Sequence, residues 1–196
     1  MNQFATPVPL TGERAALEPL TADHADGLRA VVAEGDLHTT WYTRIPAPAA
    51  VEAEIERRLD LQRQGLMAPW VVRRRDTGAV CGATTYMNVR PADRKLEIGS
   101  TFLAPSAQRT GVNAEAKLLL LTRAFEDLGC HAVEFRTHWH NHQSRTAIAR
   151  LGAKQDGVLR NDQVMPDGSL RDTVVFSITA SEWPAARNGL RHRLSR

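Results

Sequence analysis

The sequence has few cysteines and no long apolar run, and each shortage excludes a class of protein. Cys81 and Cys130 are the only cysteines and lack metal-type spacing, so two reduced thiols are expected rather than a disulfide. No segment approaches the run of about 20 apolar residues that is needed to span a membrane. Residues 1–4 lack a basic stretch followed by an apolar one, so we expect no secretory signal and a cytoplasmic location.

The excess of positive charge is confined to the end of the chain. The net charge is +3, but four arginines lie in residues 187–196, and without them 21 basic residues face 22 acidic ones. We therefore expect a near-neutral single domain over residues 1–186 and a basic C-terminal tail over 187–196, with no nucleic-acid partner. A solvated tail is the favoured interpretation. Leu190 and Leu194, spaced i, i+4, keep a short docked helix as the alternative.

The pattern of apolar residues predicts an α+β domain without internal repeats or linkers. Alternation and turn residues indicate strands, and a period near 3.6 indicates helices. The expected strands are Arg14–Leu20, Trp70–Arg75, Ala79–Val89, Lys95–Leu103, Ala132–Thr137, Val158–Val164 and Asp172–Thr179, and the expected helices begin near Thr21, Val51, Thr110 and Gln143. This order favours a mixed, mostly antiparallel sheet with helices on both faces.

One segment has the arrangement of a phosphate-binding loop. The apolar strand Lys95–Leu103 is followed by a short loop, by the stretch Gln108–Asn113, and by a helix over Thr110–Leu128 that Gly129 ends. A helix N-terminus has unpaired backbone N–H groups and a partial positive charge. A pyrophosphate placed there would be held by the main chain.

A second motif follows thirty residues later, and the two together carry a family resemblance. Asn141 and Ser144 begin the next predicted helix, and Gly152 follows eleven residues after the Asn. The chain resembles the GNAT (GCN5-related) N-acetyltransferases, and within them the branch of ribosomal-protein alanine acetyltransferases. The resemblance covers roughly Arg14–Ile178. Ala153 stands where the family commonly has Phe.

The resemblance implies that acetyl-CoA, or another acyl-CoA, lies in a gap where two parallel strands of the sheet splay apart. Asn113 departs from the family's small residue, and Asn tolerates the unusual backbone angles of a turn. The cofactor-binding residues that the resemblance implies are Phe102, Leu103, Gln108, Arg109, Thr110, Gly111, Val112, Asn113, Asn141 and Ser144.

The expected chemistry is direct attack of an amine on the thioester, without a covalent enzyme intermediate or a metal. Such a reaction needs the two reactants held together, a base for the amine and a proton for the leaving thiolate. The family suggests Glu97 as base, and a structurally paired strand carboxylate is the alternative. Ile148 occupies the place of the family's usual tyrosine acid. Ser144 is therefore the candidate proton donor, with helix capping as its alternative role.

Histidines and aromatic residues suggest an acceptor site. His138 and His140 would share one face of a strand, but a zinc site requires four ligands and neither cysteine is near in sequence. We therefore expect an imidazole that lines the acceptor cleft and can take a proton at working pH, with His138 as the catalytic candidate. Trp41 and Tyr42 lie in a segment that forms an acceptor wall in the family. Core packing of the tryptophan is the alternative.

The acceptor itself stays open at this stage. A protein N-terminus and a small-molecule amine are both compatible with the motifs, and a homodimer is an open alternative for the assembly. Two other functions are also compatible: a non-catalytic acyl-CoA-binding protein, and a nucleic-acid- or ribosome-associated protein that uses the basic tail.

Overall fold

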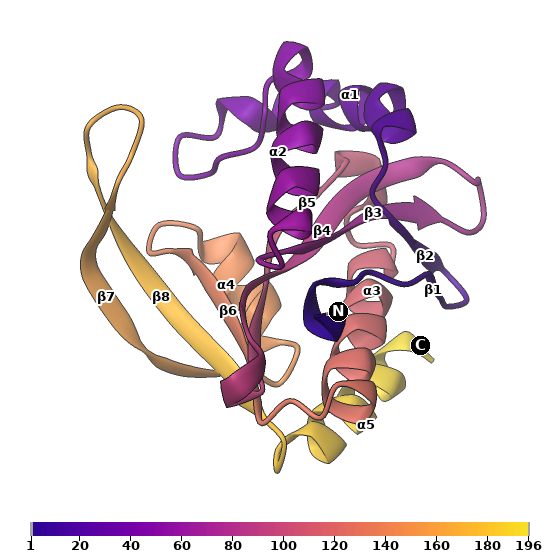
Figure 1. Ribbon diagram of the computed structural model, residues 1–196, viewed down its shortest axis with the longest axis vertical. Coiled ribbons are helices and arrows are strands. Elements are labelled where there is room, and N and C mark those ends of the chain that lie inside the picture. Colours follow the sequence, from indigo (N-terminus) through magenta and orange to yellow (C-terminus); the bar gives the residue numbers. More distant parts are fainter. Residues whose placement is uncertain (1, 196) are drawn as a thin grey trace.

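A computed structural model describes residues 2–195 of the chain, which form one twisted sheet with helices on both faces (Figure 1). The strands are β1 (Leu10–Thr11), β2 (Ala15–Pro19), β3 (Ala68–Arg74), β4 (Val80–Arg90), β5 (Lys95–Leu103), β6 (Ala132–His138), β7 (Lys154–Val164) and β8 (Leu170–Thr179). The helices are α1 (Ala25–Ala33), α2 (Val51–Arg63), α3 (Val112–Thr122), α4 (His142–Ala149) and α5 (Trp183–Leu194).

The strand order in the sheet is β1-β2-β3-β4-β5-β6-β8-β7, and β5 with β6 is the one parallel pair among the described strands. The predicted α+β class, with a mostly antiparallel sheet, is therefore confirmed. Parallel neighbours need a crossover connection. Here α3 supplies that crossover.

The parallel pair separates after three residues. Lys95, Leu96 and Glu97 pair with Ala132, Val133 and Glu134, and the two strands continue without further pairing to each other. β6 instead pairs along its whole length with β8, on its other side. The predicted splay at the cofactor strands is thus present, with Glu97 and Glu134 at its closed end.

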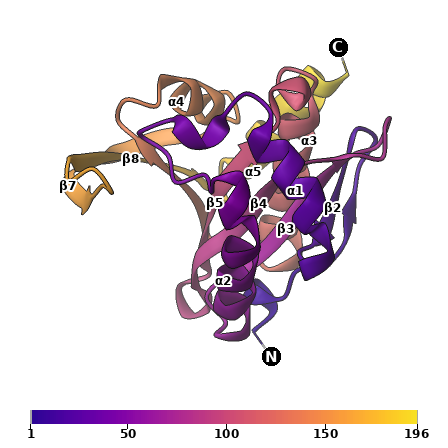
Figure 2. The same cartoon turned by 90° about the horizontal axis from the view of Figure 1, so that it is seen from above.

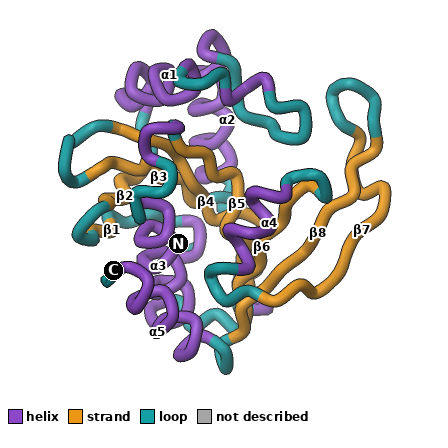
Figure 3. The backbone as a smooth tube through the Cα atoms, turned by 180° about the vertical axis from the view of Figure 1, so that it is seen from behind, coloured by secondary structure: helices purple, strands orange, loops and turns teal. Residues whose placement is uncertain are grey.

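Two layers of helices cover the sheet. α1 and α2 pack on β3 and β4 through one apolar cluster that includes Leu28, Val32 and Ile55. α3, α4 and α5 pack on the opposite face around the larger core, which includes Leu120 and Ile148. Figure 2 shows the two layers on either side of the sheet, and Figure 3 shows α3, α4 and α5 from behind.

The tail forms a packed helix as far as residue 194, so the expectation of a solvated tail is wrong for residues 187–194. Residues 183–194 form α5, whose Leu190 is 1% exposed within the main core. Arg14 Nη2 donates to the Leu194 carbonyl (2.9 Å), and Arg193 Nη1 donates to the Arg150 carbonyl (2.8 Å). The alternative expectation, a short docked helix based on the i, i+4 spacing of Leu190 and Leu194, is correct. The boundary predicted between the domain and the tail, after residue 186, falls inside this helix.

Candidate functional site

The loop between β5 and α3 has the backbone geometry of an anion-binding turn. Arg109 and Gly111 adopt left-handed φ angles of 62° and 86°, and α3 begins directly after Gly111. The N–H of Glu115 donates to the Gly111 carbonyl (3.0 Å). The N–H groups of residues 112–114 precede that bond and have no intrahelical acceptor, which suits them to a phosphate. Asn113 lies inside α3, so the turn's unusual angles fall on other residues.

Side chains of the loop hold its shape. Gln108 Nε2 donates to the Leu103 carbonyl (3.2 Å), and Thr110 Oγ1 donates to the Ala107 carbonyl (2.7 Å). Gln143 Nε2 of α4 donates to Gln108 Oε1 (3.2 Å), which ties the loop to the second motif. Gln108 and Thr110 therefore act on the loop itself, and the main chain is left to face a cofactor.

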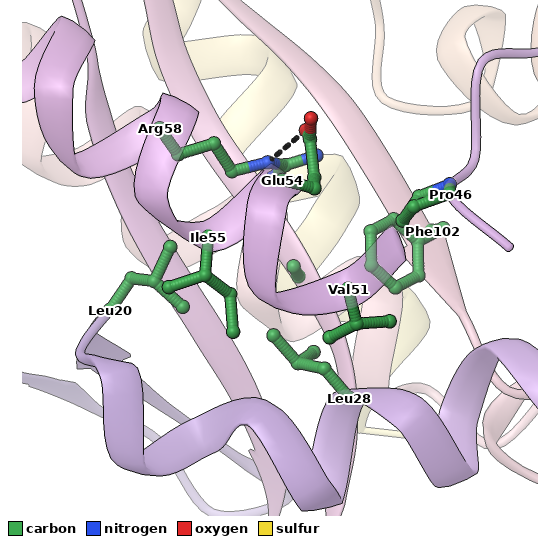
Figure 4. A pocket seen from close by; sticks show the side chains of 9 residues that line it. Leu20, Leu28, Pro46, Val51, Glu54, Ile55, Arg58 and Phe102 are labelled. Carbon is green, nitrogen blue, oxygen red and sulfur yellow. Dashed lines mark hydrogen bonds and ion pairs between the residues drawn. The ribbon is translucent and has the colours of Figure 1, made fainter. Parts of the chain in front are cut away.

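Phe102 and Leu103 are buried in opposite clusters of the core, on the two faces of the sheet. Their side chains are packed, so only their main chain can line the gap. A void of about 10 Å³ lies beside Phe102, between α1, α2 and the sheet. Figure 4 shows the side chains that line it, with Arg58 Nε donating to Glu54 Oε1 (2.6 Å) at its edge. This void is too small for anything but a water molecule.

β5 carries a bulge beside the gap. Its register with β4 shifts between Ala83 and Thr85, where Ser100 adopts a left-handed φ of 46°. The irregularity lies three residues beyond the last pair with β6, and Thr101 is exposed there. A bulge re-aims main-chain groups away from the ladder, and here it frees them beside the gap.

A buried lysine lies under this bulge, and the sequence analysis missed it. Lys117 of α3 donates from Nζ to Thr84 Oγ1 (2.9 Å) and to Thr101 Oγ1 (2.7 Å). No carboxylate among the described residues pairs with it, and burial lowers its pKa to about 7. Its sequence position on a leucine-rich helix gave no signal, because the two threonines come from distant strands.

Lys117 should make the stability of the protein depend on pH. The unfolded lysine keeps its proton up to about pH 10.4, whereas the folded one releases it near pH 7. Between these values the unfolded state binds more protons, so the free energy of unfolding rises with pH. From pH 6 to 9 we expect this rise to be on the order of 2 kcal/mol larger in wild type than in Lys117→Met. Urea unfolding at both pH values measures it, and parallel curves would contradict it.

The second motif caps α4. Asn141 Oδ1 accepts a hydrogen bond from the Ser144 N–H (2.9 Å), which is the geometry of an N-cap. The structure thus brings the two predicted residues together, with Asn141 as the capping side chain and Ser144 contributing its backbone N–H. The Asn141 amide group, Nδ2, makes no hydrogen bond to the described residues and stays available as a donor.

A conservative pair of variants separates capping from cofactor binding. Asn141→Ser retains a good N-cap acceptor but removes the amide donor, so we expect a nearly unchanged melting temperature and a CoA affinity lowered about two- to tenfold, the range of one hydrogen bond. Asn141→Ala should lower both affinity and, by about 1 kcal/mol, stability. Calorimetric titration with CoA and thermal unfolding measure the two effects. Unchanged affinity in Asn141→Ser would leave Asn141 with a capping role alone.

Glu97 is buried at the closed end of the gap. The residue is 4% exposed, Asn88 Nδ2 donates to its Oε2 (2.6 Å), and Arg136 Nε lies 3.6 Å from the same oxygen. Burial raises the pKa of this carboxyl above its ordinary value, against the opposing effects of Asn88 and Arg136. A carboxylate with a raised pKa is a better proton acceptor.

Trp41, Tyr42, His138 and His140 form one aromatic cluster. The Trp41 ring lies 5.2 Å from His138 and 5.5 Å from His140, and the Tyr42 ring lies 6.1 Å from His138. Trp41 is 54% exposed, so the core-packing alternative is wrong for it. The structure therefore brings Trp41 and Tyr42, the two residues predicted to form the acceptor wall, into contact with the predicted histidine, His138.

His138 is 3% exposed, and its Nδ1 accepts a hydrogen bond from the His140 N–H (3.1 Å). That bond requires the proton on Nε2, which is buried and has no partner among the described residues. Burial lowers the pKa of His138, which favours the neutral ring. No group of three or more His, Cys, Asp or Glu within residues 2–195 could hold a metal ion.

The sheet face beyond α2 is polar. Side chains that share a register face the same side, so Glu97, Glu134, Arg136 and His138 lie on the face that the α1–α2 loop reaches through Trp41. Figure 1 shows α1 and α2 over the β3–β4 part of this face, with the β7–β8 hairpin standing apart.

A groove of about 460 Å³ lies on this face beside Glu97. It is lined by Leu61, Leu66, Met67, Met87, Asn88, Val89, Arg90, Lys95, Leu96, Glu134 and Arg136. Asn88 and Arg136 both contact the Glu97 carboxylate, so the groove and the closed end of the gap adjoin.

Comparison with known proteins decides the family. A model described as an acetyltransferase (GNAT) domain matches residues 14–154. The chain belongs to the GNAT acetyltransferases. This result confirms the predicted family and the predicted class of enzyme, the acetyl-CoA-dependent N-acetyltransferases. No helix in the described part of this GNAT protein is long and apolar enough to cross a bilayer.

Individual relatives agree with this assignment. YdaF of Bacillus subtilis (strain 168), to which ribosomal N-acetyltransferase activity is provisionally ascribed, is 31% identical over 106 residues. These residues are 54% of this chain and 57% of YdaF, so the match spans little more than half of that relative. The GCN5-related N-acetyltransferase from Brucella melitensis is 30% identical, with a TM-score of 0.85 over 95% of this chain and 85% of that one.

A more distant structure shares the fold. RimJ of Mycobacterium smegmatis, solved in complex with CoA-disulfide, is 22% identical, with a TM-score of 0.81 over 96% of both chains. At this identity the likeness shows the shared fold, and the predicted branch of ribosomal-protein acetyltransferases is supported by the match to YdaF.

Proposed function

We propose that this protein transfers an acetyl group from acetyl-CoA to a primary amine by direct attack, and that the amine belongs to a protein N-terminus. One juxtaposition supports the reaction most strongly. The gap between β5 and β6 has a phosphate-binding helix start beyond one end and the buried carboxylate of Glu97 at the other. The CoA phosphates and the proton acceptor thus have separate places along one path.

The proposed reaction has one bond-forming step. The amine nitrogen attacks the thioester carbonyl carbon, Glu97 takes a proton from the amine, and the carbon–sulfur bond breaks. The leaving thiolate takes a proton from Ser144 Oγ, which lies at the N-terminus of α4. Ser144 then regains a proton from solvent, and Glu97 releases its proton to solvent. Main-chain groups freed by the β5 bulge would bond the pantetheine arm as a partner strand would. His138, Trp41 and Tyr42 would line the acceptor side.

A protein acceptor is proposed because of the relatives' activities. YdaF bears the name of a ribosomal N-acetyltransferase, and another protein with this fold is named a ribosomal-protein-S5-alanine acetyltransferase. The basic tail does not favour the nucleic-acid alternative, because its residues up to 194 belong to the packed helix α5. A cytoplasmic location and a homodimer stay predictions.

A transfer assay tests the function. Acetyl-CoA, propionyl-CoA and succinyl-CoA are crossed with short peptides that carry free N-termini and with small amines, while CoA release and acylated product are measured together. We expect peptide-dependent CoA release with product in equal amount. Binding of CoA without release for any acceptor would support the non-catalytic alternative instead.

A further inference from the structure

Arg171 is an unpaired cation on the acceptor face. It lies at the start of β8, two residues before Thr173, and its Nε donates to Thr173 Oγ1 (3.0 Å). Thr173 lies opposite His138 in the β6–β8 register, so Arg171 shares the face that Trp41 covers. No carboxylate among the described residues lies within ion-pairing distance of Arg171, and its Nη groups have no protein acceptor there.

A second arginine reaches the same place from the α1–α2 loop. Arg44 Nη2 donates to the Val164 carbonyl (3.1 Å), and Val164 pairs with Leu170, the neighbour of Arg171. Burial and the charge of Arg44 lower the pKa of Arg171, while Asp162 and Glu97 oppose them. Two guanidinium groups are therefore held near each other, and that of Arg171 lies within electrostatic reach of Glu97.

Like charges placed together without an ion pair favour an anionic ligand. A guanidinium presents a planar fork of N–H donors that matches a carboxylate. The cofactor phosphates are not available for this role, because α3 and its N-terminal turn pack on the opposite side of the sheet. The ligand must therefore enter from the acceptor side.

We propose that Arg171, with Arg44 beside it, binds a carboxylate of the acceptor while the acceptor's amine is delivered to Glu97. The acceptor class is thus an amine that carries an acidic group, such as an acidic peptide N-terminus. This inference rests on the proposed acetyl transfer and adds the selectivity of its acceptor site.

Matched peptides test the proposal. Two peptides with a free N-terminal serine differ only in having Asp and Glu, or Asn and Gln, at positions two and three. The α-amides of aspartate and asparagine, which lack the α-carboxylate, form a second matched pair, which distinguishes a small acidic amine from a peptide. For wild type we expect, in at least one of the two pairs, a kcat/KM at least tenfold higher for the acidic acceptor than for its neutral counterpart. This ratio should fall in 0.5 M salt.

Variants assign the selectivity to the two arginines. Arg171→Gln should lower the acidic-to-neutral ratio to about one, Arg171→Lys should retain part of it, and Arg44→Gln should lower it by less. Arg63→Gln, on the exposed side of α2, removes the same charge at a distance and should keep the ratio of wild type. CoA affinity is measured for each variant, which shows that the fold is intact.

Three results would count against the proposal, each against a different part of it. Equal kcat/KM for acidic and neutral acceptors in wild type would overturn the acidic subsite while leaving acetyl transfer established. An Arg171→Gln variant that keeps the wild-type ratio would overturn the role of Arg171. The absence of transfer to every amine, with CoA bound normally, would count against the proposed function, on which the subsite depends.

Discussion

Glu97→Gln is expected to lower the rate of acetyl transfer about a hundredfold, the lower end of the effect of a missing general base. Glutamine keeps an oxygen that can accept the Asn88 hydrogen bond, so the fold should survive, but it cannot take a proton. CoA affinity should stay close to that of wild type, because Glu97 lies at the closed end of the gap, away from the phosphate-binding turn. Steady-state kinetics and calorimetry separate the two quantities.

The pH dependence supplies the sharper readout. The base must be ionised, so the wild-type rate should fall as pH falls through the pKa of Glu97, which burial raises above that of an ordinary glutamate. Glu97→Gln should lose this acidic limb. Glu134→Gln is a matched control, because Glu134 pairs with Glu97 in the β5–β6 register and its own pKa is lowered by Lys95 and Arg136. We expect it to keep the limb.

Two results would reassign the base. If Glu97→Gln keeps the full rate while His138→Ala loses the limb, the base is the histidine. If Glu97, His138 and His140 variants all keep the wild-type profile, the enzyme positions an amine that is already neutral, and no general base is needed.

Local patterns predicted the elements around the cofactor well. The predicted strand Lys95–Leu103 has the bounds of β5, and the turn that follows leads into α3 as expected. Strand alternation and a glycine before a helix are local signals, so they can be found without the rest of the fold. The Asn141 and Ser144 motif was found for the same reason, since its cap is made within one turn.

The buried face of α3 was predicted less well. Leu118, Leu121, Phe125 and Leu128 recur at helical spacing, a pattern that predicts one apolar face with Lys117 and Arg123 on other faces. The structure buries Leu120 and Leu121 completely, and also Lys117 and Arg123. Four consecutive leucines fit several helix faces equally well, and a lysine is assigned to solvent by composition. Lys117 can be buried because the hydroxyl groups of Thr84 and Thr101, on two other strands, accept hydrogen bonds from its amino group.

The acceptor side could be predicted only in part, because contacts between residues that are far apart in the sequence form it. Trp41 and His138 are far apart along the chain, and the edge-to-face contact of their rings follows from the path of the α1–α2 loop over the sheet. Arg44 and Arg171 are likewise brought together by the loop and the β7–β8 hairpin. Contacts between residues so far apart in the sequence can be predicted only when the strand order is known.

Gly111→Asp is expected to lower CoA affinity at least tenfold, or by about 1.4 kcal/mol. The substitution places a negative charge beside the N–H groups that begin α3, where a pyrophosphate would be held. It also places a carboxylate next to Arg14, whose Cδ would lie 3.1 Å from a Cβ at this position and whose flexible side chain can move aside. That ion pair would draw a cation away from the phosphates.

Gly111→Asn is the control that separates charge from shape in this prediction. Gly111 has a φ of 86°, a left-handed conformation that Asn and Asp adopt more readily than other side chains. Both variants therefore share the same modest strain and the same contact with Arg14, and only the aspartate adds charge. Calorimetric titration with CoA should show a much smaller loss for Gly111→Asn, and the loss for Gly111→Asp should shrink in high salt. Equal losses for the two variants would show that the turn acts by its backbone shape alone. Wild-type affinity in both, with the fold intact, would remove this loop from the cofactor site.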